Sequence, residues 1–419
     1  MTFPRDPGRD LVLRLLRDPF GLIAGKAAKL ETDAFEARLA GRTVLCLHGS
    51  EAAAFFYDDD RFTRVGAMPR SVSRLLQDRR SVQSLDGPAH RRRKALFLDL
   101  LLPEARVADL ADRFDALWRE AEPEWRRRGR IALLEEVTPL LAAAACGWTG
   151  APISALGGRR LARDLEAMVA NAGRLGPRNW RARWRRGRVE RRAAKLIRRV
   201  RRGDLVLSAE TPLARIAFFE DPEDGAMSEA AAVDELLNLL RPVVAVNRFI
   251  AHAALALARE PAWRTRLRDD PAMLEPFVEE VRRLAPFFPL IAGRAARNLV
   301  WRGETVAAGR WALLDLHGTN RDPGAFPDPE RFDPGRAPSW RDQDHRFVPQ
   351  GAGDAARTHR CPGEAATVAL MKVATARLRA ADWEAAPGSL ELSNDMPPVP
   401  RGGFEMRFAG GGRGRPRAP

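Results

Sequence analysis

The feature that most constrains this chain is a long apolar segment, residues 228–261, which reads SEAAAVDELLNLLRPVVAVNRFIAHAALALAREP. Ser228 is a good N-cap residue and Pro261 ends the pattern, so the segment predicts one helix roughly 50 Å long. Around Arg241 nearly every face of this helix is apolar, which indicates burial on all sides. We therefore expect the helix to run through the middle of a large domain.

The remaining patterns predict a mainly α protein with small β-sheets. Alanine, leucine and arginine dominate residues 102–260, which favours helices. Residues 42–49, RTVLCLHG, form a candidate strand, and residues 298–316 alternate around two glycine turns, which predicts a small β-sheet. The loop-rich residues 318–360 precede one more predicted helix at residues 364–381.

Length and cysteine usage limit the class of protein. A chain of 419 residues fits a large single-domain enzyme, so we expect one domain at residues 1–409 and a flexible basic tail at residues 410–419. Cys46, Cys146 and Cys361 are far apart and odd in number, which argues against a disulfide framework and fits a reducing cytoplasm. With neither a signal segment nor an uninterrupted apolar span of about 20 residues, we expect a cytoplasmic protein that does not span a membrane.

Cys361 is the most informative cysteine, since it ends the glycine-rich loop PQGAGDAARTHRC and directly precedes Pro362, Gly363 and an amphipathic helix. A helix N-terminus favours negative charge, so we expect a lowered thiol pKa and a good metal ligand. His359 is too near in sequence to complete a zinc site, whereas one axial thiolate suits haem iron. On this local chemistry alone, a buried or merely reactive cysteine remains an equal alternative.

Two more motifs precede this cysteine. Glu280 and Arg283 have the i, i+3 spacing of an ion pair on one helix, and a Pro- and Arg-rich meander follows at residues 326–340. A long central helix, Glu-x-x-Arg, a meander and a cysteine loop, in this order, resemble the haem-thiolate cytochrome P-450 superfamily. The resemblance implies the cytochrome P-450 fold, with haem b between the long helix and the cysteine loop. It also implies that Cys361 is the axial ligand of the iron and that Arg336 joins Glu280 and Arg283 in a structural triad.

Two departures from the usual superfamily pattern indicate one branch. The cysteine loop is longer, with Asp354 and Arg357 where Phe and Gly are usual, and the long helix, LRPVVAVN, lacks the acid–threonine pair that delivers protons to bound dioxygen. Both departures, together with the segments GPRNW and LLDLHGTNRDP, are similar to the fatty-acid peroxygenases. This resemblance runs nearly end to end.

Arg241 and Pro242 are unusual in an apolar helix. A buried guanidinium is costly unless it is paired, and none of its helical neighbours is acidic: Leu237, Asn238, Val244 and Ala245. The partner must come from another element, as a salt bridge, or from a ligand carboxylate held by the planar fork. The resemblance implies the second, with the fatty-acid carboxylate on Arg241 acting as general acid–base towards peroxide. Pro242 predicts a bend that opens space over the haem, or a kink used only for packing.

Four basic residues resemble the haem-propionate contacts of the family. His90 and Lys94 lie at i, i+4 on one predicted helix, and Arg294 and His359 occupy similar propionate positions. Two propionates in a partly buried site need such cations. An exposed charge is the alternative for each of the four.

Three further residues are matched by the resemblance. Gln83 occupies the distal position that is Gln in the hydroxylating members, so it implies hydroxylation, with a surface glutamine as the alternative. Phe287 and Val169 are expected to line the acyl channel, with a core role as the alternative. Gln77, where the family often has Phe, leaves the regiochemistry open.

The resemblance thus implies an enzyme that uses hydrogen peroxide to hydroxylate long-chain fatty acids at Cα or Cβ, with some decarboxylation to terminal alkenes. No redox-partner protein is expected. A reductase-dependent P-450 monooxygenase is the alternative, and the missing proton-delivery residues disfavour it.

Charge allows an alternative of another class. The formal net charge is +15, and residues 178–203 are about half basic and include two tryptophans. Such a segment is typical of a surface that binds nucleic acid or an anionic membrane. It also fits a solvated charged face, or a face that attracts anionic fatty acids. If the chain is a nucleic-acid-binding helical protein, its binding should be sensitive to salt and the protein should show no haem absorbance.

Overall fold

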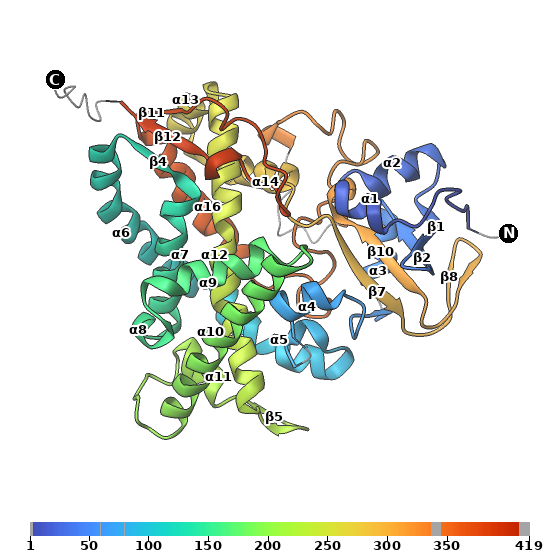
Figure 1. Cartoon of the computed structure of the whole chain (residues 1–419), viewed down its shortest axis with the longest axis horizontal. Helices are drawn as coiled ribbons and strands as arrows, with labels where there is room; N and C mark the ends of the chain where they lie inside the picture. The colour runs from blue at the N-terminus through green and yellow to red at the C-terminus, as the bar shows by residue number, and fades with distance from the viewer. Residues whose placement is uncertain (1–2, 59, 79, 337–344, 410–419) are drawn as a thin grey trace.

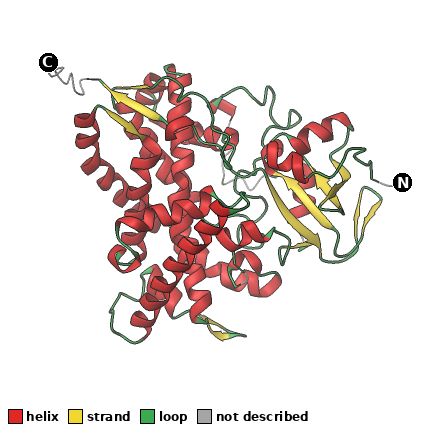
Figure 2. Ribbon diagram, in the orientation of Figure 1, coloured by secondary structure: helices red, strands yellow, loops and turns green. Residues whose placement is uncertain are grey.

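The computed structural model describes residues 3–58, 60–78, 80–336 and 345–409 (Figure 1). The predicted basic tail, residues 410–419, lies outside these described residues. A helical part surrounds α12, and a smaller part that contains most of the strands carries the N-terminus (Figure 2). The mainly α fold with small β-sheets is confirmed.

Helix α12, Glu229–Arg259, is the predicted long helix. The Ser228 hydroxyl accepts a hydrogen bond from the Ala231 N–H at 3.3 Å and so caps its first turn. By length and composition it is the one described helix apolar enough to cross a membrane, yet 89 % of its apolar window is buried inside the protein. Pro242 lies inside this continuous helix, and its side chain is exposed although Arg241 and Val243 are buried.

Long helices pack around α12 because each one presents an apolar stripe to it. Those in contact are α7 Leu133–Thr149, α9 Arg159–Ala170, α10 Pro177–Arg201, α11 Pro212–Ala217, α13 Ala262–Asp269, α14 Leu274–Leu284 and α16 Glu364–Ala380. The other α-helices are α1 Val12–Arg17, α2 Leu22–Lys29, α3 Ser50–Tyr57, α4 Arg70–Leu76, α5 Gly87–Leu101, α6 Glu104–Arg128, α8 Ile153–Leu156 and α15 Leu316–Thr319.

A five-stranded sheet forms the centre of the smaller part. Its order is β1 Ala34–Leu39, β2 Arg42–Leu47, β10 Trp311–Asp315, β7 Leu290–Ala295 and β3 Phe62–Thr63, with β2 and β10 parallel. The strands predicted at residues 298–316 are present, but they do not all belong to one sheet. β8 Leu299–Trp301 and β9 Glu304–Val306 form a separate hairpin, because the glycine turn after β9 redirects the chain into β10.

Two small sheets lie in the helical part. One joins β11 Trp383–Ala385, β12 Glu405–Phe408 and β4 Arg130–Ala132, and the other is the hairpin of β5 Glu220–Asp221 and β6 Gly225–Ala226. Sheet pairing thus ties the C-terminal strands to the helical core, while the five-stranded sheet carries β7 and so positions Arg294.

Candidate functional site

Arg241 projects from α12 towards the end of α4. Its side chain donates hydrogen bonds to the carbonyl oxygen of Leu75 at 3.3 Å, to that of Leu76, and to Asn238 Oδ1 at 2.8 Å. No ion pair between Arg241 and a carboxylate is found among the described residues. Three recorded acceptors for five N–H donors leave two donors for an anionic ligand.

Two buried arginines satisfy the carboxyl end of α4, whose last carbonyls have no partner within the helix. Arg186 of α10 donates to the Arg74 carbonyl at 3.2 Å, and Arg241 donates to the next two carbonyls. Negative partial charge at a helix C-terminus favours such cations. Two guanidinium groups from different helices are therefore held against the same end of α4.

Carboxylates behind Arg186 offset this concentration of positive charge. Arg186 donates to Asp234 at 3.0 Å and to Glu190 at 2.5 Å. Burial lowers the pKa of Arg241 to about 9, and the charge of Arg186 acts in the same direction, opposed by Asp234 and Glu235. Arg241 thus stays cationic at neutral pH.

Asn238 joins Arg241 to the predicted distal residue Gln83. Its side-chain amide donates to Gln83 Oε1 at 3.1 Å and to Glu235 Oε2 at 2.8 Å. Glu235 also accepts hydrogen bonds from the Val82 N–H at 2.9 Å and from Arg93 at 3.0 Å, so it fixes the Gln83 turn against α12. The sequence search missed Asn238 because it looked for an acid at that position.

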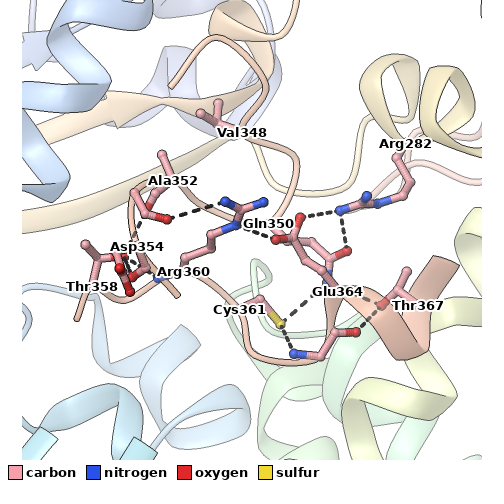
Figure 3. A network of polar contacts seen from close by, with 12 residues as sticks. Arg282, Val348, Gln350, Ala352, Asp354, Thr358, Arg360, Cys361, Glu364 and Thr367 are labelled. Atoms are coloured by element: carbon pink, nitrogen blue, oxygen red, sulfur yellow. Dashed lines mark hydrogen bonds and ion pairs between the residues drawn. The ribbon is translucent and has the colours of Figure 1, made fainter. Parts of the chain in front are cut away.

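The sulfur of Cys361 receives two N–H groups (Figure 3). The backbone N–H of Gly363 lies 3.4 Å from Sγ, and the side-chain amide of Gln350 lies 3.5 Å from it. Arg282 donates to Gln350 Oε1 at 2.9 Å and so orients this amide with its N–H groups towards the sulfur. Donors that converge on sulfur suit a thiolate.

Buried charges around Glu364 stabilise the cysteine loop. Arg360 and Arg282 both donate to Glu364 (Figure 3). Arg282 also pairs with Glu279 at 2.5 Å. The sequence interpretation used Glu280–Arg283 and overlooked Glu279–Arg282, which has the same i, i+3 spacing. This second Glu-x-x-Arg spacing, one residue before the first, is the sequence feature that could have indicated the network.

The predicted lowering of the Cys361 pKa is wrong for the polypeptide itself. Burial raises the pKa of the thiol and Glu364 adds to the effect, while the Gly363 N–H, Lys94 and Gln350 oppose it. A metal cation deprotonates a coordinating thiol outright. A half-buried cysteine sulfur with two N–H donors therefore fits the axial ligand of haem iron.

Three of the four predicted propionate residues come together beside the cysteine loop. The rings of His90 and His359 stack with centroids 3.9 Å apart, and Lys94 donates to the Thr358 and Arg360 carbonyls. Burial lowers the pKa of His90 to about 2 and that of His359 to about 4. Arg294 is on β7, with its guanidinium over the Trp311 ring at 5.0 Å.

Glu280 and Arg283 form the predicted ion pair, with both side chains fully buried and a distance of 2.7 Å. Arg283 also donates to the carbonyl oxygen of Asn320 and to that of Pro329 in the meander. The expectation that Arg336 contacts this pair directly is wrong. Arg336 pairs with Asp333 at 3.5 Å, and the Asp333 backbone N–H donates to Glu280.

Phe287 and Val169 lie on different elements. The Phe287 ring lies 4.8 Å from that of Phe249 on α12 and 4.5 Å from that of Phe288. Val169 is buried on α9, outside the main hydrophobic core against which Phe287 packs. Their expected place along an acyl channel stays a prediction.

A cleft of about 1440 Å³ lies elsewhere, and Arg259, Trp263, His317 and Arg321 are among its lining residues. None of the predicted site residues lines it. Arg241 on α12, Gln83 beside it and Cys361 in its loop remain the residues of the candidate active site.

Solved structures similar over nearly the whole chain include cytochrome P-450SP alpha with (R)-ibuprophen, at 39 % identity and a TM-score of 0.91, covering 96 % of this chain and 98 % of that one. Cytochrome P-450EX alpha with myristic acid is 30 % identical, with a TM-score of 0.90 over 97 % and 98 % of the two chains. Cytochrome P-450 OleT with arachidonic acid is 27 % identical, with a TM-score of 0.91 over 97 % and 98 %.

Comparisons by sequence match a shorter region. The family described as Cytochrome P-450 matches residues 256–402. Cytochrome P-450 BJ-3 of Bradyrhizobium diazoefficiens is 34 % identical over 32 % of this chain, and vitamin D(3) 25-hydroxylase of Pseudonocardia autotrophica is 31 % identical over 27 %. These alignments span 33 % and 28 % of the two curated relatives. Taken with the full-length structural matches, they show that the chain belongs to the cytochrome P-450 superfamily and, within it, to the branch of the fatty-acid peroxygenases.

Proposed function

We propose that this protein uses hydrogen peroxide to hydroxylate long-chain fatty acids at Cα or Cβ, with some decarboxylation to terminal alkenes. The observation that carries the proposal is the buried, cationic Arg241, which has no carboxylate partner among the described residues. An anionic ligand compensates such a charge best. Two neighbours named above, P-450EX alpha and OleT, are described with bound fatty acids.

Cys361 is the proposed iron ligand, and His90, Lys94, Arg294 and His359 are the proposed holders of the haem propionates. A thiolate-ligated haem supplies the oxidising chemistry when bound. The two N–H donors on the Cys361 sulfur hold its negative charge. We propose haem b as this cofactor.

The proposed role of Arg241 is to fix the substrate carboxylate where it can accept a proton from hydrogen peroxide and return it. Asn238 keeps the guanidinium oriented, and Gln83 lies within one hydrogen bond of Asn238. α12 carries neither an acid nor a threonine in the stretch that follows Arg241, so the substrate supplies the proton-transfer group. Pro242, with its exposed ring next to Arg241, is proposed to open space for the ligand.

Phe287 and Val169 are the proposed contacts of the acyl chain. The protein is proposed to be cytoplasmic and to need no redox-partner protein, with residues 1–409 as a single catalytic domain. A reductase-dependent monooxygenase remains the second candidate, because curated relatives include the vitamin D(3) 25-hydroxylase named above.

One experiment separates the candidates. The purified holoenzyme is mixed with hydrogen peroxide and a long-chain fatty acid, with no reductase present, and the products are identified by mass spectrometry. We expect Cα- or Cβ-hydroxy acids. If turnover requires a reductase and reduced nicotinamide and peroxide gives none, the monooxygenase is correct.

A further inference from the structure

Three apolar side chains are exposed where α9 gives way to α10. Leu175, Trp180 and Trp184 have exposed fractions of 66 %, 63 % and 61 %. The two tryptophans are at i, i+4 and therefore share one face of α10. Among the described tryptophans only these two are exposed, whereas the others are buried or half-buried. We call these three residues the α10 patch.

Positive charge without a recorded ion-pair partner lies along the same helix as the α10 patch. The side chains of Arg178, Arg181, Arg191 and Lys195 are exposed, and in the described part of the chain no carboxylate is recorded as their ion-pair partner. Glu190 is the only acid on α10, and it pairs with the buried Arg186. The exposed side of α10 is therefore both aromatic and strongly cationic.

Contacts on either side hold the α10 patch in place. Asn179, which is almost fully buried, donates to the Ser71 carbonyl at 3.2 Å and to the Asn171 carbonyl at 2.9 Å. Arg188 lies over the Trp184 ring at 4.4 Å and also pairs with Asp164 at 2.8 Å. The aromatic side chains are thus presented on a fixed helix.

The α10 patch lies close to the proposed substrate anchor. Figure 1 shows α10 beside α4, and the Asn179 contact joins the two helices. α4 ends at the carbonyls of Leu75 and Leu76, which hold Arg241. One short helix therefore connects this surface to Arg241.

We propose that the α10 patch docks the protein onto an anionic lipid bilayer. Tryptophan rings settle at the level of the headgroups, with an apolar body in contact with the acyl region and an N–H in water. Arginine and lysine around them attract anionic headgroups. A nucleic acid matches the charge but gives exposed Leu175 no apolar partner, so the bilayer accounts for more of the surface.

Docking to a bilayer deepens the proposed function and rests on it in one respect. Free long-chain acids partition into bilayers, and the α10 patch brings Arg241 close to that source of substrate. Binding to vesicles is nevertheless a property of the surface alone. It can be measured whether or not peroxide turnover is found.

The test uses the holoenzyme and sedimentation with vesicles of phosphatidylcholine, with and without phosphatidylglycerol. We expect binding to the vesicles that contain phosphatidylglycerol and weak binding to those without it, with a loss at high salt. Trp180→Ser with Trp184→Ser should weaken binding on the order of tenfold, and Arg181→Gln about fivefold. Val300→Ser is the matched control, because Val300 is 67 % exposed on β8 in the other part of the molecule.

Three outcomes overturn the proposal: equal binding by the parent and the double tryptophan variant, equal binding to both vesicle types, or tighter binding to duplex DNA than to the anionic vesicles. The haem absorbance of each variant checks its folding. The double variant should turn over dissolved fatty acid at the parent rate, so a loss confined to vesicle-borne substrate separates docking from catalysis.

Discussion

Asn238 lies one helical turn before Arg241 on α12 and accepts a hydrogen bond from its guanidinium at 2.8 Å. The same side chain donates to Gln83, so one amide connects the proposed carboxylate anchor to the proposed distal residue. An amide orients a guanidinium without neutralising it. That relationship leaves the positive charge of Arg241 available to an anionic ligand.

Replacing Arg241 should strongly weaken fatty-acid binding and leave haem binding intact. Loss of one partner of a buried charged pair costs about 2–5 kcal/mol, which is roughly 30-fold or more in affinity. A fatty-acid titration of Arg241→Ala, monitored by haem absorbance, measures the loss of affinity. An assay of peroxide-driven turnover measures the loss of activity. Arg259→Ala is the control, since this arginine lies at the exposed end of the same helix. Parent-like turnover by Arg241→Ala contradicts the mechanism.

Fatty-acid affinity should fall at high pH. Burial, followed by the charge of Arg186, lowers the pKa of Arg241 to about 9. The carboxylate binds the cationic form, so affinity should be constant near neutral pH and decline roughly tenfold per unit above about pH 9. Dissociation constants from about pH 7 to 10 test this, and the weak binding of Arg241→Ala should lack the break.

Gln350→Met should change the electronic state of the haem while preserving its binding. The variant keeps the side-chain length but removes the N–H that lies 3.5 Å from the Cys361 sulfur. A hydrogen bond to a ligand sulfur raises the reduction potential, so its loss, at about 1 kcal/mol, should lower the potential by roughly 40 mV. Potentiometric titration of the holoenzyme measures the shift.

Thr367→Val supplies the comparison for that experiment. Thr367 contacts the same Gln350 amide at 3.3 Å but is not recorded as a partner of the sulfur. The potential of this variant should stay near that of the parent. An equal shift in both variants means that loop packing, and not the sulfur hydrogen bond, sets the potential.

Glu280 and Arg336 should differ sharply in their importance for stability. Glu280→Gln leaves Arg283 buried without its carboxylate and should cost about 3–5 kcal/mol. Arg336 reaches the pair only through Asp333, so Arg336→Ala should cost about 1 kcal/mol or less. Urea unfolding of the holoenzyme compares the two. Similar losses would mean that Arg336 stabilises the pair directly.

Local sequence was enough to predict the elements whose signals are local. The Ser228 cap and the apolar run defined α12, and the i, i+3 spacing defined the Glu280–Arg283 pair, because helix geometry alone brings such residues together. The resemblance then indicated Cys361 and the family. Strand partners were harder to predict, and β10 joined β2 and β7 instead of its neighbours in sequence.

The pattern of residues 228–261 was thus enough to predict a long buried helix with an arginine that has no acid one helical turn away. The surroundings of this arginine depend on long-range packing, which brings the carboxyl end of α4 and the charge of Arg186 to it and orients Asn238. Packing also brings Gln350 to the Cys361 sulfur. It places Arg336 against Asp333, whose backbone N–H contacts Glu280, and not against Glu280 itself. These contacts join residues far apart in the chain, so they depend on how the helices and loops pack, which no local pattern encodes.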